Sequence, residues 1–316
     1  MKILILAEDP SFGAAANLVK ALRNAGHSVG SIFLRKDPKA FWEKVCNSMY
    51  IEPKDQNTKV VMHDKIGVYD HLIFVGSNAF ESFSIPDRKT PATVILTDSH
   101  YLKNYERLNA EFDAAAVNVM AMPDLMPYRQ CRPTSIYYPP FNLCNRKQKK
   151  NKHFTICHSP GPKAATNEKG TLHIREQLQR FVHKNPGAEY IEITGKTHSE
   201  SIEIKRKAHV FIDQMVPPGA KPNGYAGGLG KSGVEAMQLG CYTITNRTEH
   251  GNYLNYFDQE KETLADHLQH VYNNRKELRN RAKAQKGWSQ HNTTFDMVAL
   301  NVLRTIQNKH ENSNIR

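Results

Sequence analysis

The sequence predicts an α/β protein made of two doubly wound domains, each a parallel sheet with helices on both faces. Three observations predict this class. The chain has 316 residues, enough for two hydrophobic cores of ordinary size. Short apolar runs that suit buried strands alternate with segments of helical periodicity. A basic segment with a Pro-Pro pair, residues 137–152, has no periodicity and interrupts this alternation near the middle of the chain.

The first half opens with a strand, a loop, a helix and a second strand. Residues 3–7 are apolar, Leu18, Val19 and Leu22 have helical spacing, and Gly26 marks the end of the helix. Further strands of a parallel sheet are expected at 71–75, 93–97 and 115–119.

Polar residues follow two strands of this half. Glu8 and Asp9 come after the first strand and Gly13 lies in the same loop, so these three are candidates for an acceptor-binding edge. Asp98 and His100 follow the strand at 93–97, and either could act as a hydrogen-bond partner or a general base. The same two residues also fit a helix N-cap and a surface histidine.

The alternation starts again after the basic segment. Strands are expected at 153–157, 190–193, 210–212 and 242–245. Helices are expected after Gly170, at 200–207 and 232–239, over 261–281, and after Thr293 or Thr294. We therefore predict a first domain over 1–148, a second over 149–292, and a C-terminal helix over 293–316 that packs back on the first domain. The basic segment fits a solvated linker as well as a polyanion contact.

The densest chemical signal is a glycine-rich loop that leads into a helix, within residues 223–240. Gly230 and Gly233 let the backbone approach a ligand, and the helix N-terminus that contains Ser232 presents free N–H groups to a phosphate. Glu235, one turn further on, could accept hydrogen bonds from ribose hydroxyls. Asp213 and Gln214 end the strand before this loop.

Two cations lie on another loop of the same half. Lys163 and Lys169 follow the strand at 153–157, at the carboxyl edge where ligands bind in open α/β sheets. Together with the glycine-rich loop, they predict a site for a nucleoside diphosphate.

Four separated motifs resemble the donor-binding half of GT-B glycosyltransferases of the retaining family 4 type (glycosyl transferases group 1). They are HSPGPKAATNEKGT (158–171), ITG (193–195), FIDQM (211–215) and GVEAMQLGCYTITN (233–246). The resemblance implies a GT-B fold, two facing Rossmann-like domains with a cleft between them, and transfer of a sugar, with retention, from a nucleotide sugar, for which UDP is favoured.

The resemblance also implies roles for individual residues. Lys163 and Lys169 correspond to the basic pair that grips the diphosphate, and Glu235 to the ribose-binding carboxylate. The loop 230–233 corresponds to the phosphate-binding loop, and Thr194 and Gly195 to the strand end near the nucleobase. The sequence departs from the family at Gly227, where many members have a Glu that contacts the sugar. This departure leaves the sugar and the stereochemical course open.

No metal or cofactor is expected beyond the donor substrate. The chain has no Asp-x-Asp motif, and basic side chains with a helix dipole can neutralise a departing diphosphate. The five cysteines are scattered and fit reduced thiols. The start of the sequence contains no signal peptide and no apolar run is long enough for a membrane span, so we expect a cytoplasmic protein.

The formal charge of +12 favours polyanionic partners, either DNA or an anionic membrane surface. Two classes of acceptor remain open: a surface saccharide or lipid-linked glycan, and a hydroxymethylated DNA base of phage type. Two other functions also remain open, a sugar-nucleotide-binding protein without activity and a basic nucleic-acid-binding module. The sequence does not indicate the oligomeric state.

Overall fold

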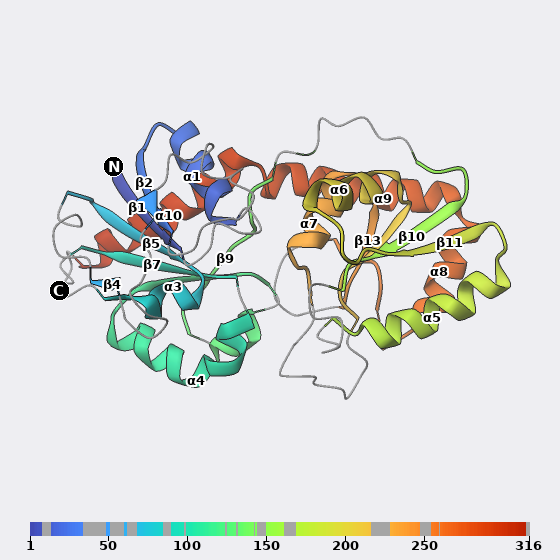
Figure 1. The fold of residues 1–316 in the computed structure, drawn as a ribbon, viewed down its shortest axis with the longest axis horizontal. Helices are drawn as coiled ribbons and strands as arrows, with labels where there is room; N and C mark the ends of the chain where they lie inside the picture. The colour runs from blue at the N-terminus through green and yellow to red at the C-terminus, as the bar shows by residue number, and fades with distance from the viewer. Residues whose placement is uncertain are drawn as a thin grey trace. The chain divides into compact units, whose positions relative to one another are not determined.

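The computed structural model of the chain describes most of the sequence in two compact units. The described residues are 1–7, 14–33, 49–50, 60–61, 68–84, 90–97, 99–123, 125–130, 132–141, 143, 150–160, 169–215, 228–246, 254–258 and 260–313. The first unit comprises Met1–Pro140 and Thr294–Arg316, and the second comprises Phe141–Thr293. Each unit is an α/β structure (Figure 1).

A parallel sheet with the order β3-β2-β1-β5-β7-β8-β9 forms the centre of the first unit. Its strands are β1 (Lys2–Ala7), β2 (Ser28–Phe33), β3 (Met49–Tyr50), β5 (His71–Val75), β7 (Ala92–Leu96), β8 (Asn118–Ala121) and β9 (Ser135–Ile136). Two short strands, β4 (Val60–Val61) and β6 (Phe83–Ser84), pair separately. The helices are α1 (Ala14–Asn24), α3 (Ser77–Ser82), α4 (Ser99–Ala114), the 3₁₀ helix η2 (Met126–Arg129) and α10 (Phe295–Ser313).

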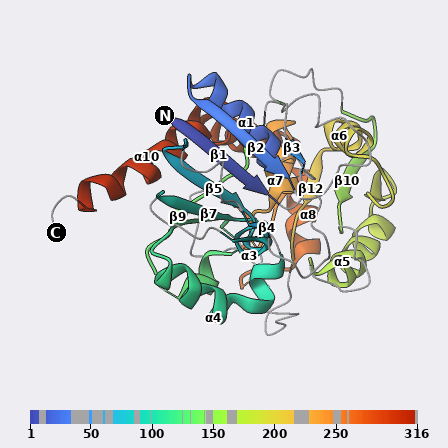
Figure 2. The ribbon, with the colours of Figure 1, turned by 60° about the vertical axis from the view of Figure 1, so that its left-hand side comes forward.

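Helices α1 and α10 pack together on one face of this sheet, and α3 and α4 lie on the other (Figure 2). Strand β1 is buried on both faces, which explains its continuous apolar sequence. On the α1 side, Ile3 and Ile5 of β1 join Leu18 of α1 and Val298 and Val302 of α10 in one core. The C-terminal helix is thereby part of the first unit.

The second unit is built on a parallel sheet with the order β11-β10-β12-β13. Its strands are β10 (Phe154–His158), β11 (Ala188–Glu192), β12 (Val210–Ile212) and β13 (Tyr242–Ile244). Its helices are α5 (Thr171–Lys184), α6 (His198–Lys207), α7 (Lys231–Gln238), α8 (Leu264–Asn273) and α9 (Arg275–Asn292).

Alternating side chains of the central strand β10 belong to the two cores of the second unit. Phe154 and Ile156 pack with residues of α5 and α8, whereas Cys157 packs with Ala236 of α7 and partly buried Ile204 of α6. Both faces of the sheet are therefore covered by helices, as the doubly wound prediction requires.

Two elements differ from the sequence expectation. Strand β8 begins at Asn118 and not at 115, because α4 continues to Ala114 and Ala116 has a φ of 50°, a turn conformation. The helical segment expected over 261–281 consists of two helices that meet at Asn274, whose φ of −110° and ψ of 65° are not helical. The Asn274 side chain donates a hydrogen bond to the His270 carbonyl at 2.8 Å and ends α8.

Gln285 fixes the rotation of α9 about its own axis. Its fully buried side chain accepts a hydrogen bond from the Thr243 N–H at 2.7 Å. It donates to the carbonyls of Thr243 at 2.8 Å and Leu254 at 2.7 Å. Leu278 and Ser289 are buried on the same side of the helix. The opposite side of α9 is therefore held toward solvent.

We predict that Gln285→Ala destabilises the protein by roughly 2–3 kcal/mol, because it leaves the buried N–H and carbonyl of Thr243 and the part-buried carbonyl of Leu254 without this partner. Urea unfolding followed by circular dichroism measures this change. Gln290→Ala, on the exposed side of the same helix, serves as the control and should be close to neutral. Equal stability of the two variants would contradict this role for Gln285.

Candidate functional site

The carboxyl edge of the second sheet contains the point at which the strand order reverses. From β10 the chain runs to β11 on one side, and β12 lies on the other side of β10. Ligands of open α/β sheets bind in the crevice at such a point. Residues that follow β10 and β12, together with the N-terminus of α7, form the candidate site.

His158, the last residue of β10, joins elements that lie on both sides of this point. Its buried ring donates from Nδ1 to the Ile212 carbonyl at 2.9 Å, which leaves Nε2 to accept from the Thr171 hydroxyl at 2.9 Å. Burial lowers the pKa of His158 to about 4, so the ring is uncharged at neutral pH. His158 thus ties the ends of β10 and β12 to the start of α5.

Asp213 holds together two groups that sequence analysis assigns to the diphosphate. Its side chain is 0% exposed, and its Oδ2 accepts a hydrogen bond from the Gly230 N–H at 2.6 Å. Its Oδ1 lies 3.5 Å from Nζ of Lys169, whose side chain is 19% exposed. The backbone carbonyl of Lys169 also accepts from the Met215 N–H at 2.9 Å. The carboxylate therefore positions Lys169 and the α7 N-terminus relative to each other.

Close packing around Asp213 explains why glycine stands at 230 and 233. A Cβ atom at Gly233 would lie 2.5 Å from Cδ1 of Leu229 and 2.6 Å from Oδ2 of Asp213. A Cβ atom at Gly230 would lie 3.0 Å from Nε2 of Gln214. Packing inside the protein thus favours glycine strongly at 233 and more weakly at 230, in addition to any approach of a ligand.

Glu235 on α7 carries a buried negative charge with two partners on α6. Nζ of Lys205 lies 2.6 Å from its Oε2, and Nε2 of His198 lies 2.8 Å from its Oε1. The side chains of Glu235 and Lys205 are 7% and 1% exposed, whereas that of His198 is 59% exposed. His198 therefore separates the carboxylate from solvent.

The partners of Glu235 decide its charge. Burial alone would raise the pKa of this carboxyl, but the charge of Lys205 and the hydrogen bond and charge of His198 outweigh burial and lower the pKa to about 2. Glu235 is therefore ionised at neutral pH. Each carboxylate oxygen has a second lone pair, so the group retains capacity for ligand hydroxyls.

The other predicted site residues differ in burial and in location. Thr194 and Gly195 are exposed after β11, and Gly195 has a φ of 62°. Gln214 is buried beside Asp213, and Ser232 is half-buried in the first turn of α7. His100 lies on α4 of the first unit. Several predicted residues lie outside the described residues: Glu8, Asp9, Gly13, Asp98 and Lys163.

Sequence analysis missed three residues of this site: His158, His198 and Lys205. Lys205 resembles a surface cation in the polar sequence of α6, yet it lies three residues after buried Ile202 and three before buried Ala208. This spacing would have placed it on the buried face of α6. His158 and His198 carry no comparable local signal, because their partners come from distant parts of the chain.

The assembled site has the properties of an anion site. It combines the Lys169 ammonium, the N-terminus of α7 and the ionised Glu235 at one edge of one sheet. Within the described part of the chain, no group of three or more His, Cys, Asp or Glu side chains could hold a metal ion. A search of the same residues finds no helix able to span a membrane.

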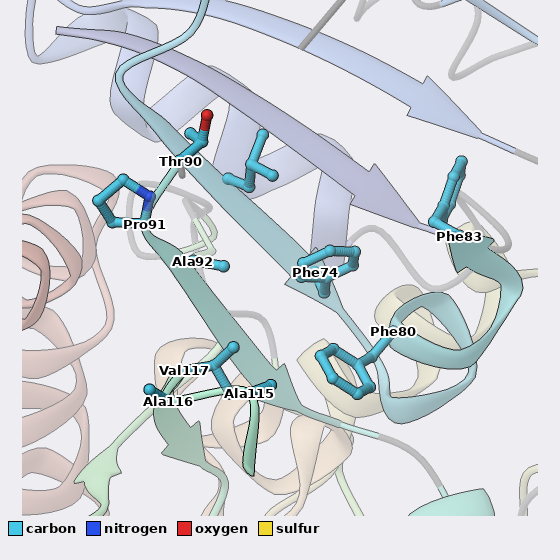
Figure 3. Close-up of a pocket in the computed structure, with 10 residues that line it drawn as sticks. Phe74, Phe80, Phe83, Thr90, Pro91, Ala92, Ala115, Ala116 and Val117 are labelled. Atoms are coloured by element: carbon cyan, nitrogen blue, oxygen red, sulfur yellow. The ribbon is translucent and has the colours of Figure 1, made fainter. Parts of the chain in front are cut away.

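An apolar pocket in the first unit has a different character (Figure 3). Its volume is about 160 Å³, and Phe74, Phe80 and Phe83 line it together with residues that precede or begin β7 and β8. Among the described residues that line it, only Thr90 has a polar side chain. None of these described side chains carries a positive charge that would hold a phosphate, and the pocket does not belong to the candidate site.

No protein-family model and no curated protein sequence matches the chain. Solved structures do match it. HepE from Anabaena, crystallised in complex with UDP and glucose, is 12% identical over 98% of this chain and 100% of its own, with a TM-score of 0.58.

The chain has the GT-B fold. Two further proteins share the fold at similar identity. A Listeria monocytogenes protein described as a UDP-N-acetylglucosamine 2-epimerase is 10% identical, over 98% of this chain and 96% of its own, with a TM-score of 0.57. The spinosyn rhamnosyltransferase SpnG is 11% identical, over 97% and 100%, with a TM-score of 0.50. The sequence prediction of a GT-B fold is thus confirmed.

We predict that Glu235 makes stability depend on pH in the acid range. Its pKa in the folded protein is about 2, below the ordinary value of 4.5, so its stabilisation is complete above the ordinary value and disappears as the pH falls toward 2. Between about pH 6 and about pH 3, the wild type should lose roughly 1–2 kcal/mol more than Glu235→Gln. Urea unfolding at both pH values measures this.

Glu176→Gln is the matched control for this experiment, because Glu176 is an exposed carboxylate paired with Arg180 on α5. Its loss of stability with pH should follow the wild type. Identical pH dependence of Glu235→Gln and the wild type would contradict the buried ion pair.

Proposed function

We propose that this protein transfers a sugar from a nucleoside diphosphate sugar, with UDP as the favoured nucleotide, to a hydroxyl acceptor. One observation carries the proposal: Lys169, the α7 N-terminus and ionised Glu235 share one carboxyl edge in the second unit. The fold supports it, since HepE has the same fold and was crystallised with UDP and glucose.

In this proposal the protein acts mainly on the leaving group. Breaking the bond between the sugar and the diphosphate leaves negative charge on the phosphate oxygens. The Lys169 ammonium and the positive end of the α7 helix dipole stabilise that charge as it develops. Asp213 positions both groups and does not itself contact the donor, because its side chain is fully buried. The reaction needs no metal under this scheme.

Glu235 would bind the ribose of the donor. Its Oε1 now accepts from His198, whose exposed ring can move away when a ligand enters. Its Oε2 stays paired with buried Lys205, which keeps the carboxylate ionised and oriented. Thr194 and Gly195, exposed at the end of β11, would lie toward the nucleobase. Lys163 would join Lys169 at the diphosphate.

The proposed stereochemistry, acceptor and cellular location are based on the sequence. Retention of configuration follows from the resemblance to retaining family 4 enzymes. The acceptor is a surface saccharide or lipid-linked glycan, or a hydroxymethylated DNA base, with Asp98 and His100 as candidate groups that receive its proton. Glu8, Asp9 and Gly13 would contribute to the acceptor side. We propose a location in the cytoplasm, with association to a membrane surface or to DNA as further candidates.

The first assay incubates the protein with UDP-, GDP- and ADP-sugars in excess EDTA, with and without DNA that contains 5-hydroxymethylcytosine. Release of the nucleoside diphosphate and the masses of all products are measured. Transfer gives a glycosylated product together with UDP. An epimerase would change the donor sugar without a glycosylated product, and a binding protein would release nothing. Conversion of the donor sugar alone would contradict the proposal, and so would the absence of release when oligosaccharide and lipid-linked acceptors are also supplied.

We predict that Lys169→Ala lowers kcat/KM by about 10²-fold, because it removes one cation from the leaving-group site. Lys184→Ala, at the exposed C-terminal end of α5, is the matched control and should retain the wild-type value. Circular dichroism checks that Lys169→Ala is folded, since Lys169 also offsets the charge of Asp213. Folded Lys169→Ala with wild-type turnover would exclude this site.

A further inference from the structure

Helix α9 of the second unit is strongly basic. Its eighteen residues contain six cations and one carboxylate, Glu277. The cations are Arg275, Lys276, Arg279, Arg281, Lys283 and Lys286. The candidate donor site uses none of these residues.

Four of the cations form a continuous row on one face of the helix, which we call the α9 basic row: Lys276, Arg279, Lys283 and Lys286. Their spacing of i, i+3, i+7 and i+10 places them on one side of an α-helix. At a rise of about 1.5 Å per residue the row is about 15 Å long, with successive Cα atoms about 4.5–6 Å apart along the axis. The side chains of the first three are exposed and that of Lys286 is half-exposed.

The orientation of the α9 basic row is fixed by the buried side of the helix. The buried residues of α9 are Leu278, Gln285 and Ser289. The Gln285 side chain forms three hydrogen bonds with backbone groups of Thr243 and Leu254. The helix cannot rotate about its axis without breaking these bonds. The row is therefore presented outward as a rigid line of positive charge.

The row has no acidic partner within the described residues. Glu277, the single carboxylate of α9, is paired with Arg281 and His270. No ion pair among the described side chains includes Lys276, Arg279, Lys283 or Lys286. Other helices balance their cations locally, as Arg107 with Glu111 on α4 and Arg180 with Glu176 on α5.

We propose that the α9 basic row binds the phosphate backbone of duplex nucleic acid. A duplex presents phosphates in a rigid, regular line, which is the charge pattern complementary to this row. The exposed side of α9 also has Asn280, Gly287 and Gln290, which suit contacts to phosphate and sugar.

A membrane surface fits this face less well. An interfacial helix inserts apolar side chains beside its basic ones. None of the described large apolar side chains that are exposed lies on α9; they are Met1, Val68, Leu172, Leu254, Tyr256 and Leu300. The row itself therefore offers charge without apolar side chains, and the nearby Tyr256 packs against Arg281 of the same helix. This binding goes beyond sugar transfer and does not depend on the acceptor being DNA.

The test compares the wild type with a quadruple variant, Lys276→Gln, Arg279→Gln, Lys283→Gln and Lys286→Gln. Glutamine removes the charge and keeps helix propensity. Binding of the full-length protein to a fluorescent DNA duplex of mixed sequence is followed by anisotropy over a series of salt concentrations. The matched control is Lys2→Gln, Lys103→Gln, Lys152→Gln and Lys184→Gln, four exposed lysines elsewhere that give the same change in net charge.

We predict that the α9 variant, with the four substitutions in the row, binds the duplex about 10²-fold more weakly than the wild type at low salt. The slope of log K against log salt concentration should become less steep by about 3–4, because up to four phosphate contacts are lost. The control should keep most of the slope. Circular dichroism confirms that both proteins are folded.

Two results would overturn the proposal. One is an equal loss of affinity and slope in both quadruple variants, which would show that only net charge matters. The other is wild-type binding to phosphatidylglycerol vesicles but not to the duplex, lost in the α9 variant, which would assign the row to membranes.

Discussion

The buried carboxylate of Asp213 is the constraint on which the candidate site depends. A negative charge with 0% exposure is stable only beside donors and cations, and here these are the Gly230 N–H and the Lys169 ammonium. The same contact brings the loop before α7 so close that a side chain at 233 would overlap Asp213 and Leu229, and one at 230 would be crowded by Gln214 and Asp213. The geometry of the site therefore follows from packing around one residue. A diphosphate would meet a cation and a helix N-terminus that are already in place.

Glu235, one helical turn further along α7, is likewise a buried carboxylate that is held by a cation and a hydrogen-bond donor. Its charge is retained inside the protein because Lys205 is buried with it, and His198 covers the side toward solvent. A buried pair of this kind contributes little net stability compared with apolar residues, but it fixes where a charge stands. We infer that this position, and not stability, is the reason for the pair. Under the proposed function, the α7 helix would supply both the terminus that faces the diphosphate and the carboxylate that binds the ribose.

The sequence predicted the parts that depend on local pattern. The apolar runs of β1, β5, β10 and β12 are buried strands, and the glycine-rich segment does lead into helix α7 at Gly230. What it could not predict depends on contacts between distant segments. The roles of His158 and Lys205 arise from partners 13 to 54 residues away. The turn at Ala116 and the break at Asn274 depend on backbone conformations without Gly or Pro to signal them. The residue roles assigned by family resemblance remain predictions.

Hydrogen exchange of the protein with and without saturating UDP tests the central claim most directly, because it locates binding without assuming an activity. The account predicts slower exchange in residues 169–171, 194–198 and 228–235, at the carboxyl edge of the second sheet. Exchange around the apolar pocket, in residues 72–83 and 115–117, should not change. Unaltered exchange at that edge under saturating UDP, or protection confined to the first unit, would contradict it.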